Sequence, residues 1–333
     1  MTQTVLVTGG NGFVGGWCIV ELLRQGYAVR ATVRSMDKAE AARTAIDRKV
    51  ETDRLRFVAA DLMQDDGWDA AMAGVDYVLH VASPLPMGAV LDREALVPQA
   101  RDGTLRVLRA AVKANVRRVV MTSAAATTRQ PLGSNIVSDE TLWADPADPQ
   151  FDAYRVSKIR AERAAWDFMR AEGGDTQLTT ILPGAVFGPV LTADGMGSVK
   201  IIKDLLAGRP AAMPQLGFWV VDVRDLADAH IRAMTEPQAA NERVIVAGHF
   251  LWMAEMAKIL REKTGAKTPG RVLPNWVVRL LSPFMADLRT LVPLVGRRIE
   301  MNTGKAKRLL GIVPRPAEET LSDCADSLTA TRA

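Results

Sequence analysis

The first half of the chain alternates two patterns of apolar and polar residues. Short runs rich in valine, leucine and isoleucine predict strands, and the segments between them show helical spacing, most clearly over 12–25, 93–114 and 154–170. Strands that alternate with helices form a parallel sheet covered on both faces, so the pattern predicts an α/β fold with a doubly wound Rossmann sheet. The predicted strands are residues 5–8, 28–34, 55–60, 77–81, 118–122 and 178–182.

The regular alternation ends near residue 188. Short elements, prolines and helical patterns follow, with one further strand predicted at 244–247. We therefore expect a Rossmann domain over 1–188. The remainder, 189–333, is expected to be a smaller, mainly substrate-binding part, with some of its segments returning to the Rossmann core.

A glycine-rich loop separates the first predicted strand from the first predicted helix. Gly9 would allow a tight turn, Gly12 would let the helix N-terminus approach a phosphate, and Gly15 would let the helix pack closely on the strand. The N–H groups and dipole at such a helix start stabilise phosphate charge. The alternative is a tight turn that binds no ligand. The predicted dinucleotide contacts are Gly9, Asn11, Gly12, Phe13 and Val14.

The end of the second predicted strand indicates which dinucleotide binds. NAD-binding units place Asp or Glu there to accept hydrogen bonds from the ribose 2′-hydroxyl, whereas this chain has Arg34 followed by Ser35. A guanidinium suits a 2′-phosphate by charge and by geometry, and Lys38 would add a second positive charge. We therefore predict NADP(H) as the cofactor; the alternative is a pair of solvated surface cations.

Composition excludes several other classes of protein. The chain has 333 residues, of which 48% are hydrophobic and 24% charged, as in ordinary globular proteins. The net charge of +4 comes from basic residues spread along the chain, so no nucleic-acid partner is expected. Cys18 and Cys324 lie far apart, which indicates reduced thiols in a cytoplasmic protein. The three histidines share no ligand spacing, so no metal site is expected.

The sequence gives no indication of a targeting or membrane segment. A strand is predicted from the first residues onward, with no basic segment before it. The apolar stretch 272–295 is interrupted by three prolines and by Arg279, Asp287 and Arg289. Since a membrane span needs about 20 uninterrupted apolar residues, we expect a buried pair of helices there instead of an anchor.

Tyr154 and Lys158 lie four residues apart in a predicted helix, which places both side chains on one helix face. A phenol can donate a proton to a carbonyl oxygen as a hydride arrives at the carbonyl carbon. A nearby ammonium favours the phenolate, so the lysine is expected to lower the tyrosine pKa while it binds the cofactor ribose. The pair predicts acid–base catalysis, although the same spacing also occurs by chance on ordinary helix surfaces.

Taken together, these motifs resemble the extended short-chain dehydrogenases/reductases of the NAD-dependent epimerase/dehydratase family, and among them the dihydroflavonol reductase-like branch. The resemblance extends through nearly the whole chain in family order. It is carried by residues 7–15, 31–34, 61–62, 80–84, 120–123, 153–158, 183–189 and 221–225.

The resemblance implies further cofactor contacts. Asp61 and Leu62 would lie by the adenine. Several of the other implied positions would also be ordinary apolar core in an α/β protein. The residues implied to line the ribose and nicotinamide are Val81, Ala82, Ser83, Pro183, Val186 and Ser198.

One position departs from the family pattern. The pattern ends the fifth strand with Thr-Ser-Ser, and its second serine helps to bind the substrate carbonyl, whereas this chain reads Thr122-Ser123-Ala124. Losing one donor at a developing oxyanion can cost about 10²–10³ in rate. Ser123 is the candidate catalytic hydroxyl, although in a regular strand it would point away from the face of Ala124. Thr127 or Thr128 could supply a hydroxyl instead.

The resemblance and the Tyr–Lys pair predict reversible hydride transfer between NADP(H) and an apolar aldehyde or ketone. Alternatives on the same scaffold are a hydroxysteroid dehydrogenase and a sugar-nucleotide epimerase or dehydratase, and Ala124 leaves open a non-catalytic NADP(H)-binding regulatory protein. Proteins of this kind commonly form symmetric homodimers, so a homodimer is a possible assembly. The apolar substrate is inferred from the expected lining: Leu85, Pro86, Met87, Met196, Met213, Pro214, Phe218 and Trp219.

Overall fold

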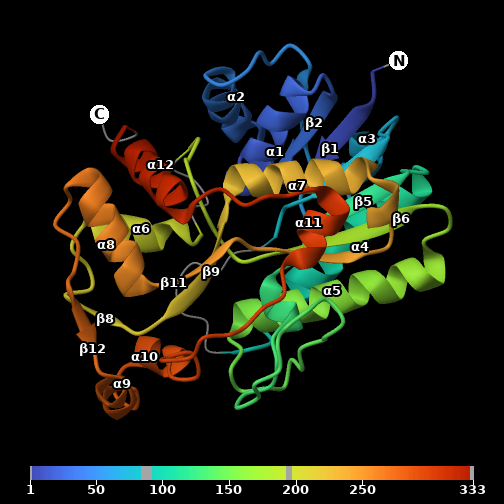
Figure 1. Cartoon of the computed structure of the whole chain (residues 1–333). Coiled ribbons are helices and arrows are strands. Elements are labelled where there is room, and N and C mark those ends of the chain that lie inside the picture. The colour runs from blue at the N-terminus through green and yellow to red at the C-terminus, as the bar shows by residue number, and fades with distance from the viewer. Residues whose placement is uncertain (1, 84–91, 193–196, 331–333) are drawn as a thin grey trace.

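Seven parallel strands form the central sheet of the computed structural model, which describes residues 2–83, 92–192 and 197–330 (Figure 1). All seven strands predicted from the sequence occur, each with its ends within one residue of the prediction. The Rossmann α/β fold is therefore confirmed. The strands are β1 (Thr4–Val7), β2 (Ala28–Val33), β3 (Leu55–Ala59), β4 (Tyr77–His80), β5 (Arg118–Thr122), β6 (Gln177–Pro183) and β10 (Arg243–Val246).

The order of the strands places a ligand crevice beside β1. The sheet reads β10-β6-β5-β4-β1-β2-β3, so β1 pairs with β2 on one side and with β4 on the other, both in parallel. The chain therefore continues from β1 to β2 and β3 on one side, and then crosses over to place β4 on the other side of β1. Such a reversal opens a crevice at the carboxyl ends of the strands, where doubly wound proteins bind their ligands.

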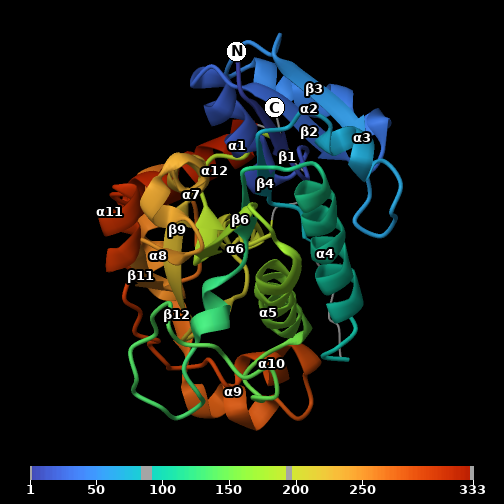
Figure 2. The same cartoon turned by 90° about the vertical axis from the view of Figure 1, so that its right-hand side faces the viewer.

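Helices cover both faces of the sheet and explain why its central strands are mostly apolar. α1 packs with α7 over one face, and α4 packs with α5 over the other (Figure 2). Alternate residues of β1 contribute to the two sides, because Val5 and Val7 belong to the core under α1 and α7 while Leu6 belongs to the core under α4. The helices of this part are α1 (Phe13–Arg24), α2 (Ala39–Asp47), α3 (Trp68–Met72), α4 (Val97–Lys113), α5 (Ala153–Glu172) and α7 (Val223–Thr235).

The C-terminal part contains more strands than the sequence predicted. One strand was expected beyond residue 188, but the described residues of this part form four others besides β10, and β7 precedes them. These strands have only three to six residues, too few to show a clear alternation of apolar and polar positions. They are β7 (Ala185–Phe187), β9 (Gly217–Asp222) and β11 (His249–Trp252) in one sheet, and β8 (Ala212–Pro214) and β12 (Arg271–Leu273) in another.

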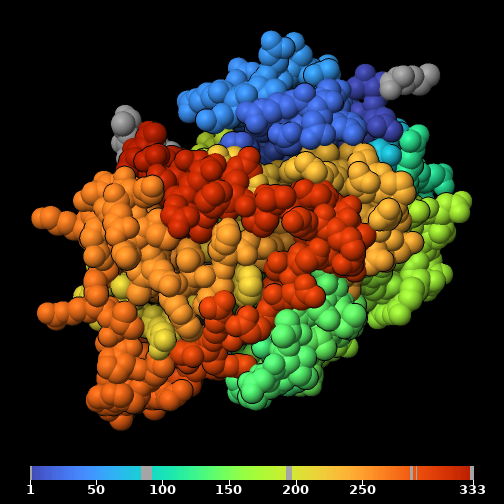
Figure 3. Space-filling view, viewed as in Figure 1, coloured from blue at the N-terminus to red at the C-terminus, as the bar shows by residue number. Residues whose placement is uncertain are grey.

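Segments from the C-terminal part return to the central sheet. β10 extends the sheet beside β6, and residues of α7 and α11 share a hydrophobic core with β1 and α1. In Figure 3 the red C-terminal residues form a band between the blue N-terminal residues and the orange segment. The boundary near residue 188 stays a prediction. The remaining helices are α6 (Val199–Leu206), α8 (Met253–Thr264), α9 (Asn275–Leu281), α10 (Ala286–Leu291), α11 (Gly304–Leu310) and α12 (Ala317–Ala330).

The stretch 272–295 forms a pair of helices, but its predicted burial was wrong for one face. Val278 and Val295 are buried, whereas Trp276 is 65% exposed and Phe284 is 85% exposed. The reason is length, because helices of seven and six residues present only one side to a core. Among the described residues, no helix has the length and apolar content needed to cross a membrane.

Candidate active site

The loop between β1 and α1 has the shape of a phosphate cradle. Gly9 has φ +71°, a conformation that favours glycine, and its carbonyl accepts a hydrogen bond of 2.9 Å from the Gly12 amide. A Cβ added to Gly15 would lie 2.3 Å from the Gly9 oxygen, so only glycine allows this approach of helix and loop. α1 begins at Phe13, and no side chain caps it. The amides of its first turn are thus available to a phosphate group, next to Asn11 and Val14.

Arg34 directly follows the carboxyl end of β2, as the sequence predicted. Its side chain is exposed, and no hydrogen bond or ion pair within the described residues holds its guanidinium. Ser35 starts the short 3₁₀ turn Met36–Lys38 by accepting a hydrogen bond from the Asp37 amide. This turn keeps Lys38 on the same loop as Arg34, so the loop presents two cations at the edge of the crevice.

A buried histidine fixes the end of β4 against the end of β1. The Thr8 hydroxyl accepts hydrogen bonds of 3.0 Å from the amides of Val81 and Ala82 and lies 2.9 Å from Nδ1 of His80. Because that hydroxyl already accepts two bonds, it donates its own proton to Nδ1, which makes His80 neutral. Burial lowers the pKa of His80 to about 3, with a further lowering by Lys158. The sequence analysis did not assign Thr8 and His80 this positioning role.

The other predicted cofactor contacts follow the carboxyl ends of the strands. Asp61 follows β3, and its carboxylate accepts a hydrogen bond of 3.0 Å from the Met63 amide. Pro183 is the last residue of β6, and the hydroxyl of Ser198 donates to the carbonyl of Val186 over 2.7 Å. Asp61 and Pro183 lie at the carboxyl edge of the central sheet or directly beyond it, whereas Val186 lies on β7 of the three-stranded sheet and Ser198 precedes α6. The positions not yet named, which follow β3 and β4, are Leu62 and Ser83.

Tyr154 and Lys158 lie at the start of α5, where that helix approaches β5. Asp152 caps the helix by accepting a hydrogen bond of 2.9 Å from the Arg155 amide. Lys158 is buried, and its Nζ donates to the carbonyl of Thr122 over 3.2 Å. The same Nζ lies 5.9 Å from the centre of the Tyr154 ring. The two side chains therefore share one face of α5 at the carboxyl end of the sheet.

Burial dominates the protonation of both groups. It raises the pKa of Tyr154 to about 12, against a lowering by Arg155 and with a further raising by Asp152. It lowers the pKa of Lys158 to about 8, and the Glu162 carboxylate opposes this shift. The expectation that the lysine lowers the tyrosine pKa was therefore wrong for the protein alone. The cost of placing a phenolate out of water exceeds the stabilisation by nearby cations.

The hydroxyl of Ser123 has a partner on α5, the helix that carries Tyr154 and Lys158. It donates to Glu162 over 2.7 Å and is 2% exposed. The same carboxylate accepts from the Thr180 hydroxyl over 2.9 Å and from Arg243 Nε over 2.8 Å. The described contacts join the Ser123 hydroxyl to a buried ionic network. The catalytic assignment of Ser123 stays a prediction. Sequence reasoning missed this network, although Glu162 follows Lys158 at the same four-residue spacing.

The neighbouring hydroxyls are also engaged. Thr127 donates to the carbonyl of Ala124 over 2.9 Å, and Thr128 donates to that of Ala125 over the same distance. Both hydroxyls thus close the 3₁₀ turn Ala125–Thr128 that follows β5. At position 124 itself the chain offers only a methyl group.

Some of the residues expected to line an apolar substrate site lie within the described residues. Of these, some are buried in the core of the C-terminal part and others are partly exposed. Met213 is fully buried in the core around α6 and α8, so it is a packing residue. Phe218 and Trp219 on β9 are partly exposed, and the Trp219 indole donates to the carbonyl of Ile299 over 2.7 Å. Pro214 is buried at the end of β8. The residues that lie outside the described ones are Leu85, Pro86, Met87 and Met196.

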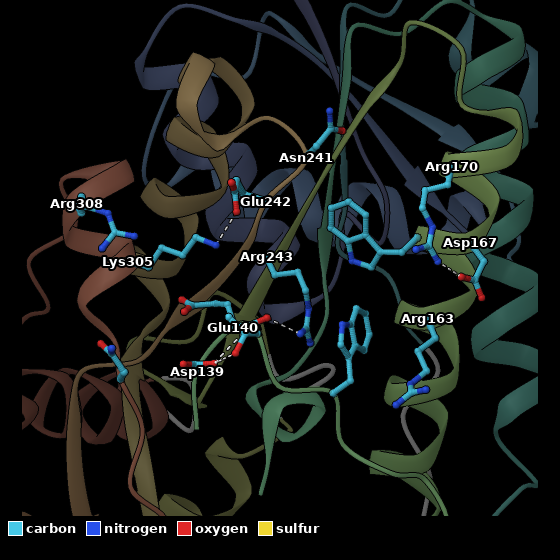
Figure 4. A pocket seen from close by; sticks show the side chains of 14 residues that line it. Asp139, Glu140, Arg163, Asp167, Arg170, Asn241, Glu242, Arg243, Lys305 and Arg308 are labelled. Carbon is cyan, nitrogen blue, oxygen red and sulfur yellow. Dashed lines mark hydrogen bonds and ion pairs between the residues drawn. The ribbon is translucent and has the colours of Figure 1, made fainter. Parts of the chain in front are cut away.

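A separate hollow of about 750 Å³ lies beside the edge strand β10 (Figure 4). Its lining includes Arg163 and Arg170 from the second half of α5, Arg243 of β10, and Lys305, which pairs with Glu242 over 2.6 Å. Tyr154 and Lys158 are not among its lining residues. Within the described residues, no group of three or more side chains could hold a metal ion.

Comparison with known proteins agrees with this arrangement. The model of the NAD dependent epimerase/dehydratase family matches residues 5–248. The cinnamoyl-CoA reductase CAD2 of Medicago truncatula is 32% identical over 98% of this chain and 95% of its own length. The ketoreductase azaE of Aspergillus niger is 36% identical over 75% of this chain and 79% of its own length.

Solved structures show the same likeness in three dimensions. Yeast methylglyoxal/isovaleraldehyde reductase Gre2, solved as a complex with NADPH, superposes with a TM-score of 0.82 and 26% identity over 99% of both chains. Vestitone reductase from alfalfa gives a TM-score of 0.77 at 25% identity, again over 99% of both chains. The matching family model, the full-length relatives and the shared fold together show that the chain belongs to the NAD dependent epimerase/dehydratase family, within the extended short-chain dehydrogenases/reductases.

Proposed function

We propose that the protein is an NADP(H)-dependent oxidoreductase that reduces an apolar aldehyde or ketone, with Tyr154 as the proton donor. The observation that carries this proposal is the placement of Tyr154 and Lys158 on α5 at the carboxyl end of β5. The glycine loop and Arg34, whose guanidinium has no partner within the described part of the chain, follow the carboxyl ends of β1 and β2 at the same edge of the sheet. Relatives whose names describe reductases of several carbonyl compounds support the same reaction class.

Each of these groups has one task. Bound NADPH supplies the hydride. The amides around Gly12 and Phe13 bind the pyrophosphate, and Arg34 binds the 2′-phosphate. Lys158 positions the ribose, and the phenolic oxygen of Tyr154 holds the proton that the carbonyl oxygen receives. Holding the reacting groups in contact turns an encounter into an oriented first-order step.

The protonation state of Tyr154 favours reduction at neutral pH. With a pKa of about 12 the phenol keeps its proton, which is the form required to donate to a carbonyl oxygen. Alcohol oxidation requires the phenolate as the base. Oxidation should therefore become faster as the pH rises from 7 to 10, while reduction remains nearly constant or slows.

The test is NADPH consumption by the purified protein against a panel of aldehydes, ketones and steroids. We expect turnover with at least one apolar carbonyl compound, and a loss of about 10²-fold or more in Tyr154→Phe, since general acid catalysis contributes about 10²–10⁴. Tyr27→Phe, which removes a phenolic hydroxyl outside this site, is the matched control and should keep full activity. NADPH binding with no turnover on any compound would contradict the proposal and favour a regulatory protein.

A further inference from the structure

Arg129 is a partly buried arginine, and one nitrogen of its guanidinium, Nη1, has no hydrogen-bonding partner among the described residues. Its Nη1 has no solvent exposure and no acceptor, and the described contacts give the side chain no ion pair. The guanidinium carbon lies 5.9 Å from the centre of the Phe151 ring. Buried donors are normally hydrogen-bonded, so the unpaired Nη1 marks a place where an acceptor belongs.

Arg129 belongs to the surroundings of Tyr154. It directly follows the turn Ala125–Thr128 that leaves β5, and this turn packs against α5. Phe151, on which Arg129 stacks, precedes Tyr154 by three residues and is itself buried. Asp152 and Arg155 act electrostatically on both Arg129 and Tyr154. The charge of Arg297, in the C-terminal part of the chain, also lowers the pKa of Arg129.

The two nearby carboxylates are already engaged elsewhere. Asp152 caps α5 and pairs with Arg155. Asp148 accepts hydrogen bonds from the amide of Leu132 and from both the amide and the side chain of Gln150. Burial, and then Arg155 and Arg297, lower the pKa of Arg129 to about 9, against a smaller raising by the two acids. The site therefore has an excess of positive charge that the described residues do not neutralise.

The surroundings of Arg129 are also firmly held. Arg93 donates hydrogen bonds to the carbonyls of Phe151, Pro146 and Asp148 over 3.0, 2.9 and 2.6 Å. These bonds tie the segment that carries Phe151 to the start of the α4 region. A platform anchored in this way can hold the guanidinium in a fixed place before a ligand arrives, which reduces the entropy lost on binding.

We propose that Arg129 binds a carboxylate group of the substrate, so that the preferred carbonyl compound has an apolar body and an acidic end. This inference rests on the proposed reductase function and adds an acidic end to the apolar carbonyl compound proposed as its substrate. A planar guanidinium matches a carboxylate through two parallel hydrogen bonds, and the excluded water strengthens the attraction. The bond would also orient the carbonyl relative to Tyr154.

The experiment measures kcat/KM for NADPH-dependent reduction of matched pairs, each an oxo acid or carboxybenzaldehyde and its methyl ester. We expect the free acid of at least one pair to exceed its ester. Arg129→Met should lower that acid-to-ester ratio about 10- to 100-fold, the range of a hydrogen-bonded charge pair, and Arg129→Lys should restore part of it. Arg163→Met, the same change on the second half of α5, is the matched control and should leave the ratio unchanged.

Other outcomes separate this inference from the proposed function. If esters are reduced but no acid exceeds its ester, or if Arg129→Met lowers both equally, the carboxylate assignment is wrong while the reductase function stands. An equal loss of kcat/KM for acids and esters would mean that Arg129 contributes to packing or binds a water molecule. If neither acids nor esters are reduced and NADPH still binds, the reductase function itself fails. Thermal unfolding of each variant shows whether a loss reflects folding instead of recognition.

Discussion

At the scale of single residues, we propose that Arg34 determines the choice of dinucleotide. It lies at the end of β2, exposed and unpaired among the described residues, where a 2′-phosphate would meet it. Replacing it in Arg34→Ala should raise the Kd for NADPH about tenfold or more, since a hydrogen bond to a charged group contributes about 1.5–3 kcal/mol. The Kd for NADH should change little. Fluorescence titration of the reduced cofactors measures both values, and equal weakening of the two would contradict this role.

Ser123 allows a second test at this scale. Its hydroxyl donates to the buried Glu162 carboxylate, so Ser123→Ala removes one bond of that network. We expect a loss of about 1–3 kcal/mol in the free energy of unfolding, as for a charged acceptor left short of a partner. The effect on kcat should be less than tenfold. A fall of about 10²–10³ in kcat at unchanged stability would instead make Ser123 the oxyanion donor.

At the scale of elements, two buried histidines join neighbouring segments and make stability depend on pH. The Thr122 hydroxyl of β5 lies 2.6 Å from Nε2 of His230 on α7, whose Nδ1 lies 2.8 Å from the Leu226 carbonyl. Burial lowers the pKa of His230 to about 4, against a raising by that carbonyl. Below pH 6.5 the unfolded chain binds protons that the folded chain does not, so stability falls as the pH drops towards 4.

The measurement is urea unfolding at several pH values. The loss attributable to His230 between pH 6.5 and 4 should be roughly 3 kcal/mol, at about 1.4 kcal/mol per pKa unit. His230→Gln should remove this share of the dependence and leave the share of His80, whereas His249→Gln, which changes an exposed residue of β11, should leave the dependence unaltered. An identical pH dependence in His230→Gln and in the unmodified chain would show that the imidazole is not held neutral.

Elements with a long or strongly apolar pattern were predictable, and short ones were not. Strands buried on both faces are continuous apolar runs, so β1, β5 and β6 could be recognised from sequence. β8 and β12 have three residues each and contribute to a small sheet whose position depends on distant contacts. The exposed face of α9 was missed for a related reason, since apolar composition alone does not show which side of a short helix meets a core.

The residues of the candidate site also fall into those that could be predicted from the sequence and those that could not. Gly9, Gly12, Tyr154 and Lys158 are close in sequence to the elements that position them, so roles for them could be proposed from spacing. The network around Glu162 joins residues of β5, β6 and β10, which are far apart along the chain. No local sequence pattern identifies these distant residues as members of one network. That Nη1 of Arg129 has no partner among the residues that the structure describes is likewise visible only when its folded neighbours are known.

At the scale of the whole molecule, the Rossmann part depends on the rest of the chain. α7 covers α1, and Val221, Leu226 and Leu310 share the core of β1. A fragment of residues 1–188 would expose this surface and lose β10 from the sheet edge. We therefore expect the fragment to lack a cooperative thermal transition, while the full chain unfolds in one. Cooperative unfolding of the fragment by circular dichroism would show instead that 1–188 is an independent domain.

The most direct test of the central claim is an experimental structure of the protein with NADP⁺ and a carbonyl ligand. We expect the pyrophosphate at Gly9–Phe13, the 2′-phosphate at Arg34, and the Tyr154 hydroxyl within hydrogen-bonding reach of the ligand oxygen, about 2.6–3.2 Å. The nicotinamide should contact the carbonyl carbon at about 3–3.5 Å. A nicotinamide bound away from Tyr154, or a dinucleotide bound outside the glycine loop, would contradict the account.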